Sequence, residues 1–174
     1  MIKIKVQKLI INSPNAQLAG RFYQPTNARS TVVILSHGFG SSMKGTVNYA
    51  IPLVRAGFPV GLFDFTGCGL SGGRSVNTSV LTEAQDLEAV IKAVRQWSPK
   101  AHLALLGCSQ GGLVSALVAA RHPKLISKLV LEFPAFCIPH DCRVGHVQEV
   151  PFDLRNVPSA INVHGHVVGS RYVR

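Results

Sequence analysis

The sequence predicts an α/β fold in which a mostly parallel sheet carries helices on both faces and follows an antiparallel hairpin. Three observations support this prediction. The first residues alternate polar and apolar side chains, as half-exposed strands do, whereas later strand-length runs are continuously apolar, as in strands covered on both faces. Segments of helical periodicity alternate with those apolar runs, which is the order that produces a parallel sheet.

The expected hairpin lies at the N-terminus. Residues 3–9 (KIKVQKL) alternate Lys or Gln with apolar side chains, and residues 17–23 (QLAGRFY) are typical of a second strand. The intervening residues 12–15, Asn-Ser-Pro-Asn, have the composition of a turn. The two strands should therefore pair antiparallel.

The expected parallel strands are short apolar runs rich in leucine or β-branched residues. They lie at residues 31–36, 58–65, 102–107 and 126–133. The first helix between them is expected at residues 47–56, where Gly57 ends it and Pro52 shortens or kinks it.

The second helix has the clearest pattern in the chain. One apolar stripe runs along it, formed by Val80, Ala84, Leu87, Ile91 and Val94. Ser79 is expected to cap its start, and Ser98 and Pro99 to end it. The third helix is expected at residues 110–122, closed by Pro123, and beyond Pro134 no sustained period is present.

The composition indicates a globular chain. Of its 174 residues, 47% are hydrophobic and 15% charged, and the apolar stretches are too short to span a bilayer. The N-terminus lacks the apolar block of a signal peptide, so we expect a cytoplasmic protein with no membrane partner.

The net charge of +10 raises the hypothesis of a nucleic-acid-binding protein. However, the Lys and Arg residues are scattered and no binding motif accompanies them, so no nucleic-acid partner is predicted.

The cysteines are expected to be reduced, because the chain is neither short nor cysteine-dense. They are Cys68, Cys108, Cys137 and Cys142. The last two, with His140 and His146, offer an alternative interpretation as metal ligands, but the paired C-x-x-C spacing of zinc sites is missing. We therefore predict no metal site.

Residues 107–111, Gly-Cys-Ser-Gln-Gly, match the G-x-S-x-G pattern directly after a buried strand and directly before a helix. A serine hydroxyl is a weak nucleophile and must project from a sharp turn toward a base, and flanking glycines permit that turn. We therefore predict that Ser109 is a nucleophile. The N–H of Gln110, at the start of the helix, is placed to stabilise an oxyanion.

A second loop fits the same chemistry. Residues 36–40, Ser-His-Gly-Phe-Gly, follow an earlier buried strand, and the N–H of Phe39 is expected to reach the same oxyanion. We interpret His37 as a structural histidine that holds its loop, not as the catalytic base.

Residues 64–72 (DFTGCGLSG) contain a formal G-x-G-x-x-G after a strand. A dinucleotide site would need a helix opening at the third glycine and an acidic residue ending the next strand. Residues 73–77 continue instead as polar loop, and Asp86 and Glu88 lie in a helix. No cofactor is predicted.

Taken together, the motifs H-G-F-G, D-F-T-G-C-G-L-S-G and G-C-S-Q-G-G, in this order within residues 31–133, resemble the α/β-hydrolase fold family. Within it the chain is most similar to bacterial feruloyl and cinnamoyl esterases. The resemblance implies a serine esterase that cleaves hydroxycinnamate esters through an acyl-enzyme. The family usually has His where this chain has Cys68 and Cys108, and neither position supplies the catalytic triad.

The resemblance also implies a division of the chain into the N-terminal part of the hydrolase core, residues 1–133, and part of a lid insertion, residues 134–174. In the family, lid side chains contact the ring hydroxyls of the aromatic acyl group. The matching positions are Asp141, Gln148 and Tyr172.

The family order also implies that the triad acid and histidine follow the lid, and nothing after Ser109 offers that context. We do not assign the base to any later histidine. The histidines considered are His140, His146, His164 and His166. We expect a fold incomplete at its C-terminus and a chain that is weak or inactive by itself. The alternative is a non-catalytic, truncated homologue that acts as a binding or residual domain. The expected partner is a small-molecule ester, with a second copy of the chain in a homodimer as an alternative partner.

Overall fold

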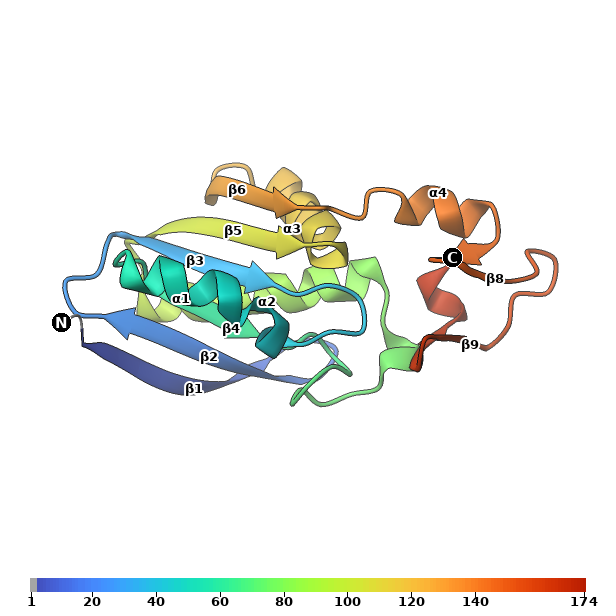
Figure 1. Cartoon of the computed structure of the whole chain (residues 1–174), viewed down its shortest axis with the longest axis horizontal. Coiled ribbons are helices and arrows are strands. Elements are labelled where there is room, and N and C mark those ends of the chain that lie inside the picture. The colour runs from blue at the N-terminus through green and yellow to red at the C-terminus, as the bar shows by residue number, and fades with distance from the viewer. Residues whose placement is uncertain (1–2) are drawn as a thin grey trace.

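The computed structural model of the chain describes residues 3–174 and is built on a six-stranded sheet (Figure 1). The strand order is β1-β2-β4-β3-β5-β6. The strands are β1 (Ile4–Asn12), β2 (Gln17–Pro25), β3 (Thr31–Ser36), β4 (Val60–Phe63), β5 (His102–Cys108) and β6 (Ile126–Glu132). Strands β4, β3, β5 and β6 pair in parallel, whereas β2 is antiparallel to both β1 and β4. The predicted mostly parallel sheet with an N-terminal hairpin is confirmed.

Helices cover both faces of the sheet, as predicted. Helix α1 (Val47–Arg55), preceded by the 3₁₀ turn η1 (Met43–Thr46), packs on one face against Val33, Leu35 and Leu62. Helices α2 (Val80–Trp97) and α3 (Gln110–Arg121) pack on the other face. Figure 1 shows this three-layer arrangement.

The helix ends follow the signals in the sequence. Ser79 caps α2: its hydroxyl accepts a hydrogen bond from the Thr82 N–H, while the Thr82 hydroxyl accepts one from the Ser79 N–H. Helix α1 ends just before Gly57, which has φ +89°. Pro52 lies inside α1, and the helix is only nine residues long.

Strand β6 is less covered than its apolar sequence predicts. It forms one edge of the sheet, and Leu129 and Val130 are 39% and 53% exposed. Helix α3 packs against it, but the buried residues that gather around α1 on the opposite face include none from β6. The edge strand therefore exposes an apolar surface.

Residues 134–174, here called the C-terminal segment, form short regular elements where the sequence predicted none. They are α4 (Ile138–Arg143), β7 (His146–Val147), β8 (Val150–Pro151), β9 (Ala160–Val163), β10 (His166–Gly169) and the 3₁₀ turn η3 (Ser170–Tyr172). The strands make two separate two-stranded antiparallel sheets. Elements this short leave too few residues for a detectable period.

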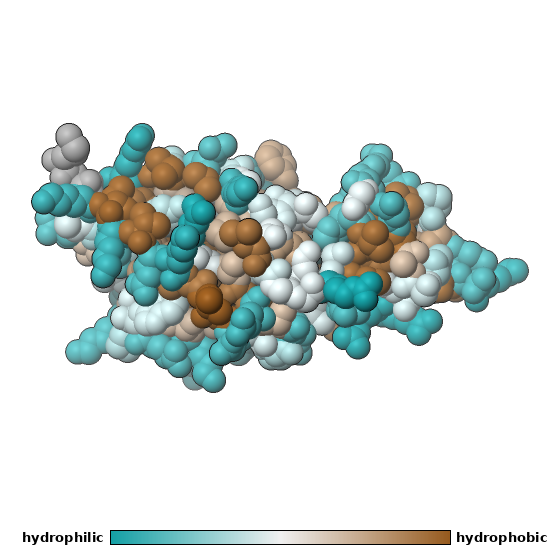
Figure 2. Space-filling model, turned by 90° about the horizontal axis from the view of Figure 1, so that it is seen from below, coloured by the Kyte–Doolittle hydropathy of each residue, from teal (hydrophilic) through white to brown (hydrophobic). Residues whose placement is uncertain are grey.

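The C-terminal segment has a small hydrophobic core of its own, which includes Val147, Val163 and Val168 and receives Phe39 from the sheet's β3–α1 loop. Figures 1 and 2 show the segment as a distinct lobe beyond the carboxyl ends of the parallel strands. Within residues 3–174, no helix combines the length and apolar character needed to cross a membrane.

Candidate active site

Ser109 stands in the turn between β5 and α3, with φ 51° and ψ −120°. A non-glycine residue rarely adopts this backbone conformation, which costs about 1–3 kcal/mol and persists only when the surroundings enforce it. The conformation projects the side chain at the carboxyl end of a central strand, and Ser109 is exposed. The strand–turn–helix context predicted for this serine is present.

The glycines around Ser109 are required by close backbone approach. A Cβ on Gly107 would lie 2.3 Å from the carbonyl oxygen of Gly111, and a Cβ on Gly111 would lie 2.4 Å from that of His37. Real Cβ atoms do not approach oxygen so closely. The turn therefore packs directly against the loop that follows β3.

The two loops meet at the serine. A Cβ on Gly38 would lie 3.2 Å from Cβ of Ser109 and 3.7 Å from its Oγ. The N–H groups of Phe39 and Gln110, the predicted oxyanion donors, make no hydrogen bond within residues 3–174. Both donors therefore remain available on the loops that flank the serine.

His37 is held by the backbone on both sides of its ring. It is 2% exposed, the Phe65 N–H donates to its Nε2 at 3.1 Å, and its Nδ1 lies 2.8 Å from the Gly38 carbonyl oxygen. These contacts fix the neutral tautomer that carries its proton on Nδ1. Burial lowers the pKa of His37, although the Gly38 hydrogen bond opposes the effect. Its geometry agrees with the structural interpretation and leaves no ring nitrogen for the serine.

Other histidines make contacts elsewhere. The ring of His166, on β10, packs edge-on against Phe39 with 4.8 Å between ring centroids, and burial lowers the pKa of His166. His122 pairs with Glu88 at 3.1 Å. Within residues 3–174, no histidine forms a hydrogen bond with Oγ of Ser109.

The side chain of Gln110 is buried and bonded at both ends. Its Nε2 donates to Oε2 of Glu83 on α2 at 2.8 Å, and the hydroxyl of Tyr172 donates to its Oε1. Burial raises the pKa of Glu83 to about 8, while the hydrogen bond from Gln110 lowers it by less. The residue after Ser109 is thus tied to both the core and the C-terminal segment.

Glu83 is a site residue that the sequence reasoning missed, although a signal was present. It lies three residues after Val80 and four before Leu87, on the apolar side of α2. A carboxyl group on a buried helix face needs a partner, which here is an amide side chain.

The three residues predicted to contact substrate lie on different elements. Asp141 is half-buried on α4, and Gln148 is exposed at the β7–β8 turn with φ 53°. Tyr172 is 7% exposed on η3, and its ring packs against that of Phe39 with 5.7 Å between centroids. No hydrogen bond joins the three within the described residues, and only Tyr172 reaches the serine turn.

The cysteine thiols near the site remain protonated at neutral pH. Burial raises the pKa of Cys68 to about 12, and burial together with a hydrogen bond to Glu132 does the same for Cys108. Among residues 3–174, no three His, Cys, Asp or Glu side chains gather closely enough to hold a metal ion.

Comparisons with known proteins agree with this geometry. The sequence pattern of the family described as serine aminopeptidase, S33, matches residues 27–166. Rat monoglyceride lipase is 29% identical over 126 residues, which are 72% of this chain and 42% of the lipase. A 2-hydroxy-6-oxononadienedioate/2-hydroxy-6-oxononatrienedioate hydrolase of Escherichia coli K12 is 37% identical over 103 residues, or 57% of this chain and 34% of the hydrolase. The chain therefore spans less than half the length of these curated relatives.

Among solved structures, Est1E from Butyrivibrio proteoclasticus with ferulic acid bound is similar over nearly the whole chain. The TM-score is 0.88 at 25% sequence identity, and the match covers 95% of this chain and 69% of Est1E. Residues 134–174 are a much larger part of the chain than the part that the match leaves uncovered. The match therefore includes the C-terminal segment as well as the sheet.

Proposed function

The chain belongs to the serine aminopeptidase S33 family of α/β-hydrolases, and from this premise we propose that it is a carboxylic ester hydrolase that forms an acyl-enzyme on Ser109. The observation that carries the proposal is the arrangement of the serine turn. Ser109 projects from a constrained conformation beside two backbone N–H groups that have no other partner within residues 3–174.

The proposed reaction has two steps. In the first, Oγ of Ser109 attacks the ester carbonyl carbon, the developing oxyanion accepts hydrogen bonds from the N–H groups of Phe39 and Gln110, and the alcohol leaves. In the second, water attacks the acyl-enzyme and releases the acid. The side chain of Gln110 donates a hydrogen bond to Glu83 and accepts one from Tyr172, and these two bonds hold Gln110 and its N–H in place.

We propose further that the acyl group is a hydroxycinnamate. The similarity to Est1E, whose solved structure contains ferulic acid, supports this choice of substrate. The rings of Phe39 and Tyr172 pack edge to face next to the serine turn and make an aromatic environment that suits a phenyl ring. In this proposal the C-terminal segment acts as a lid, and Asp141, Gln148 and Tyr172 contact the ring hydroxyls.

We also propose that residues 1–174 position the nucleophile and the oxyanion donors without a general base. Two observations support this: the backbone binds both ring nitrogens of His37, and no histidine within residues 3–174 forms a hydrogen bond with Oγ of Ser109. Serine hydrolases stripped of their triad retain roughly 10³–10⁴-fold acceleration over water. We expect slow, Ser109-dependent hydrolysis from these residues.

The test measures hydrolysis of p-nitrophenyl ferulate and p-nitrophenyl butyrate, which share one leaving group, by the wild type, S109A and the matched control S30A, which changes an exposed serine. We expect p-nitrophenyl ferulate to be preferred, S109A to abolish hydrolysis, and S30A to leave it unchanged. Added imidazole should accelerate the wild type, because it supplies the missing base.

A different result would contradict each part of the proposal. Hydrolysis that survives in S109A would exclude the serine mechanism. A bell-shaped pH profile without any response to imidazole would show that a base is already present. A preference for the butyrate ester would remove the hydroxycinnamate assignment alone.

A further inference from the structure

The C-terminal segment contacts both residues whose N–H groups are the proposed oxyanion donors. The ring of Phe39, in the β3–α1 loop, packs against the segment's small hydrophobic core. It meets His166 of β10 with 4.8 Å between ring centroids and Tyr172 of η3 with 5.7 Å. The side chain of Gln110 accepts a hydrogen bond from the Tyr172 hydroxyl. Tyr172 therefore contacts both donor residues at once.

The hydrogen bonds of the Gln110 side chain have a defined direction. Its Nε2 donates to Oε2 of Glu83 at 2.8 Å, so its Oε1 is the atom that accepts from Tyr172. All three side chains are buried. A buried amide that lost either bond would leave a polar atom unsatisfied, which is costly. The position of the segment is thus coupled to the residue that follows Ser109.

The loop that carries Phe39 is anchored to the core at its start and to the segment in its middle. At the start, the buried ring of His37 is hydrogen-bonded to the backbone on both sides. In the middle, a Cβ on Gly40 would lie 3.3 Å from Cβ of His166, so the loop and β10 are in contact. If the segment moved away, the Phe39 ring would lose these partners and meet water. The Phe39 N–H would then lose the packing that fixes its direction.

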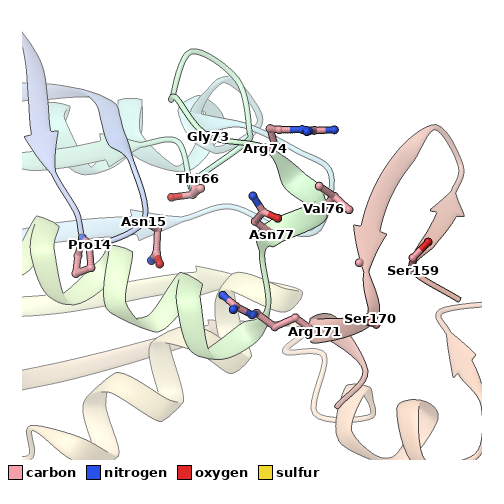
Figure 3. Close-up of a pocket in the computed structure, with 11 residues that line it drawn as sticks. Pro14, Asn15, Thr66, Gly73, Arg74, Val76, Asn77, Ser159, Ser170 and Arg171 are labelled. Carbon is pink, nitrogen blue, oxygen red and sulfur yellow. The ribbon is translucent and has the colours of Figure 1, made fainter. Parts of the chain in front are cut away.

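The segment also docks on the core at a second place, away from the oxyanion donors. There the 3₁₀ turn η2 (Ser75–Asn77) lies next to β10, and Figure 3 shows Val76 beside this strand. The Ser75 hydroxyl donates to the carbonyl oxygen of Val167 at 2.7 Å. A Cβ on Gly169 would lie 2.3 Å from the carbonyl oxygen of Val76, so the two backbones touch. A change at this contact can therefore loosen docking while the donors and the tyrosine stay intact.

We propose that Tyr172 is a positioning residue for the oxyanion site, and that both donors are set only while the C-terminal segment is docked. This inference rests on the proposed ester hydrolysis, because it concerns the donors which that reaction would use. Docking of the segment and binding of an oxyanion are then linked, so each must favour the other. The Tyr172 hydroxyl can still accept a hydrogen bond, so this role is compatible with contact to a substrate hydroxyl.

Ethylboronic acid is a suitable probe, because its adduct imitates the oxyanion and it has no aromatic group that could pack on the segment. Oγ of Ser109 bonds to boron, the serine proton passes to the buffer, and the tetrahedral adduct carries one negative charge beside the donors. Calorimetry measures the affinity of the adduct. Hydrogen exchange of the full chain, read by mass spectrometry, measures opening of β9, β10 and η3, with β1 and β2 as internal reference.

In the wild type, the probe at about ten times its Kd should slow exchange in β9, β10 and η3 about tenfold and leave the reference strands unchanged. S109A cannot form the adduct, so its exchange should not respond. S75A removes a docking contact far from the donors and should exchange faster without the probe, yet keep its affinity and be protected by the same factor. The matched control S30A changes an exposed serine and should behave as the wild type.

Y172F separates a positioning role from a structural one. Because the hydroxyl orders Gln110, Y172F should weaken the adduct about fivefold and reduce the protection that the adduct gives. A merely structural hydroxyl would give the result expected for S75A, with unchanged affinity and full protection, and would overturn the proposal. An adduct that forms in the wild type without slowing exchange would also overturn it, while the proposed hydrolysis would stand. Absence of any adduct in the wild type would contradict the serine site itself and both proposals with it.

Discussion

Replacing Glu83 with Gln is expected to flatten the dependence of folding stability on pH. Glu83 is 6% exposed and accepts a hydrogen bond from Nε2 of Gln110 at 2.8 Å. Burial raises its pKa from the ordinary 4.5 to about 8. The folded protein therefore keeps this proton until the pH approaches 8, whereas the unfolded chain releases it near pH 4.5.

The direction and size of the effect follow from that difference. The raised pKa contributes stability that is fully present below the unfolded value and is lost as the pH rises through the folded value. One pKa unit corresponds to about 1.4 kcal/mol, so the difference between 4.5 and 8 predicts a loss of about 5 kcal/mol across that window. E83Q keeps an oxygen that accepts from Gln110 and removes the titration.

Urea unfolding of the wild type and E83Q between pH about 5 and about 8 measures this effect. The free energy of unfolding of the wild type relative to E83Q should fall as the pH rises, because the lowered pKa values of His37 and His166 affect both proteins alike. E149Q, which changes an exposed carboxylate, serves as the control and should follow the wild type. Equal slopes in the wild type and E83Q would refute the assignment of a buried, proton-holding carboxyl.

Three further predictions concern the C-terminal segment, the serine turn and the exposed edge of the sheet. Y172F removes the hydroxyl that donates to Gln110 and should speed proteolysis within the C-terminal segment at a cost of about 1 kcal/mol, and unchanged cleavage would contradict this. G111A places a methyl 2.4 Å from the His37 carbonyl oxygen and should lower the free energy of unfolding by more than about 2 kcal/mol; a melting temperature equal to the wild type would disprove the close approach. V130K puts a charge on the exposed edge strand β6 and should reduce self-association in sedimentation experiments, whereas unchanged association would place the contact elsewhere.

The sheet and its helices were largely predictable because each element carries a local signal. The β-branched run at residues 31–36 became β3 with the same bounds, and the apolar stripe with its Ser79 cap became α2. The strand predicted at residues 58–65 spans only Val60–Phe63, because the residues on either side belong to the loops that connect it to α1 and η2. Local patterns thus predict whether a segment is a helix or a strand more reliably than they predict the residues at which it begins and ends.

The C-terminal segment and the support of Gln110 could not be predicted in the same way. Strands such as β7 have only two residues, which is too few for a periodicity to develop. The contact between Tyr172 and Gln110 joins residues 62 positions apart, so no spacing in the sequence indicates it. The serine turn could be predicted from the sequence because its residues are contiguous and its chemistry demands glycine on both sides.

Mass spectrometry of the protein mixed with p-nitrophenyl ferulate tests the central claim most directly, because it detects the covalent intermediate itself. Without a base, deacylation should be slow, so the acyl-enzyme should accumulate. We predict a mass increase of one feruloyl group on the peptide that contains Ser109, and none in S109A. Acylation at another residue, or hydrolysis without any modification of Ser109 under rapid quenching, would contradict the account.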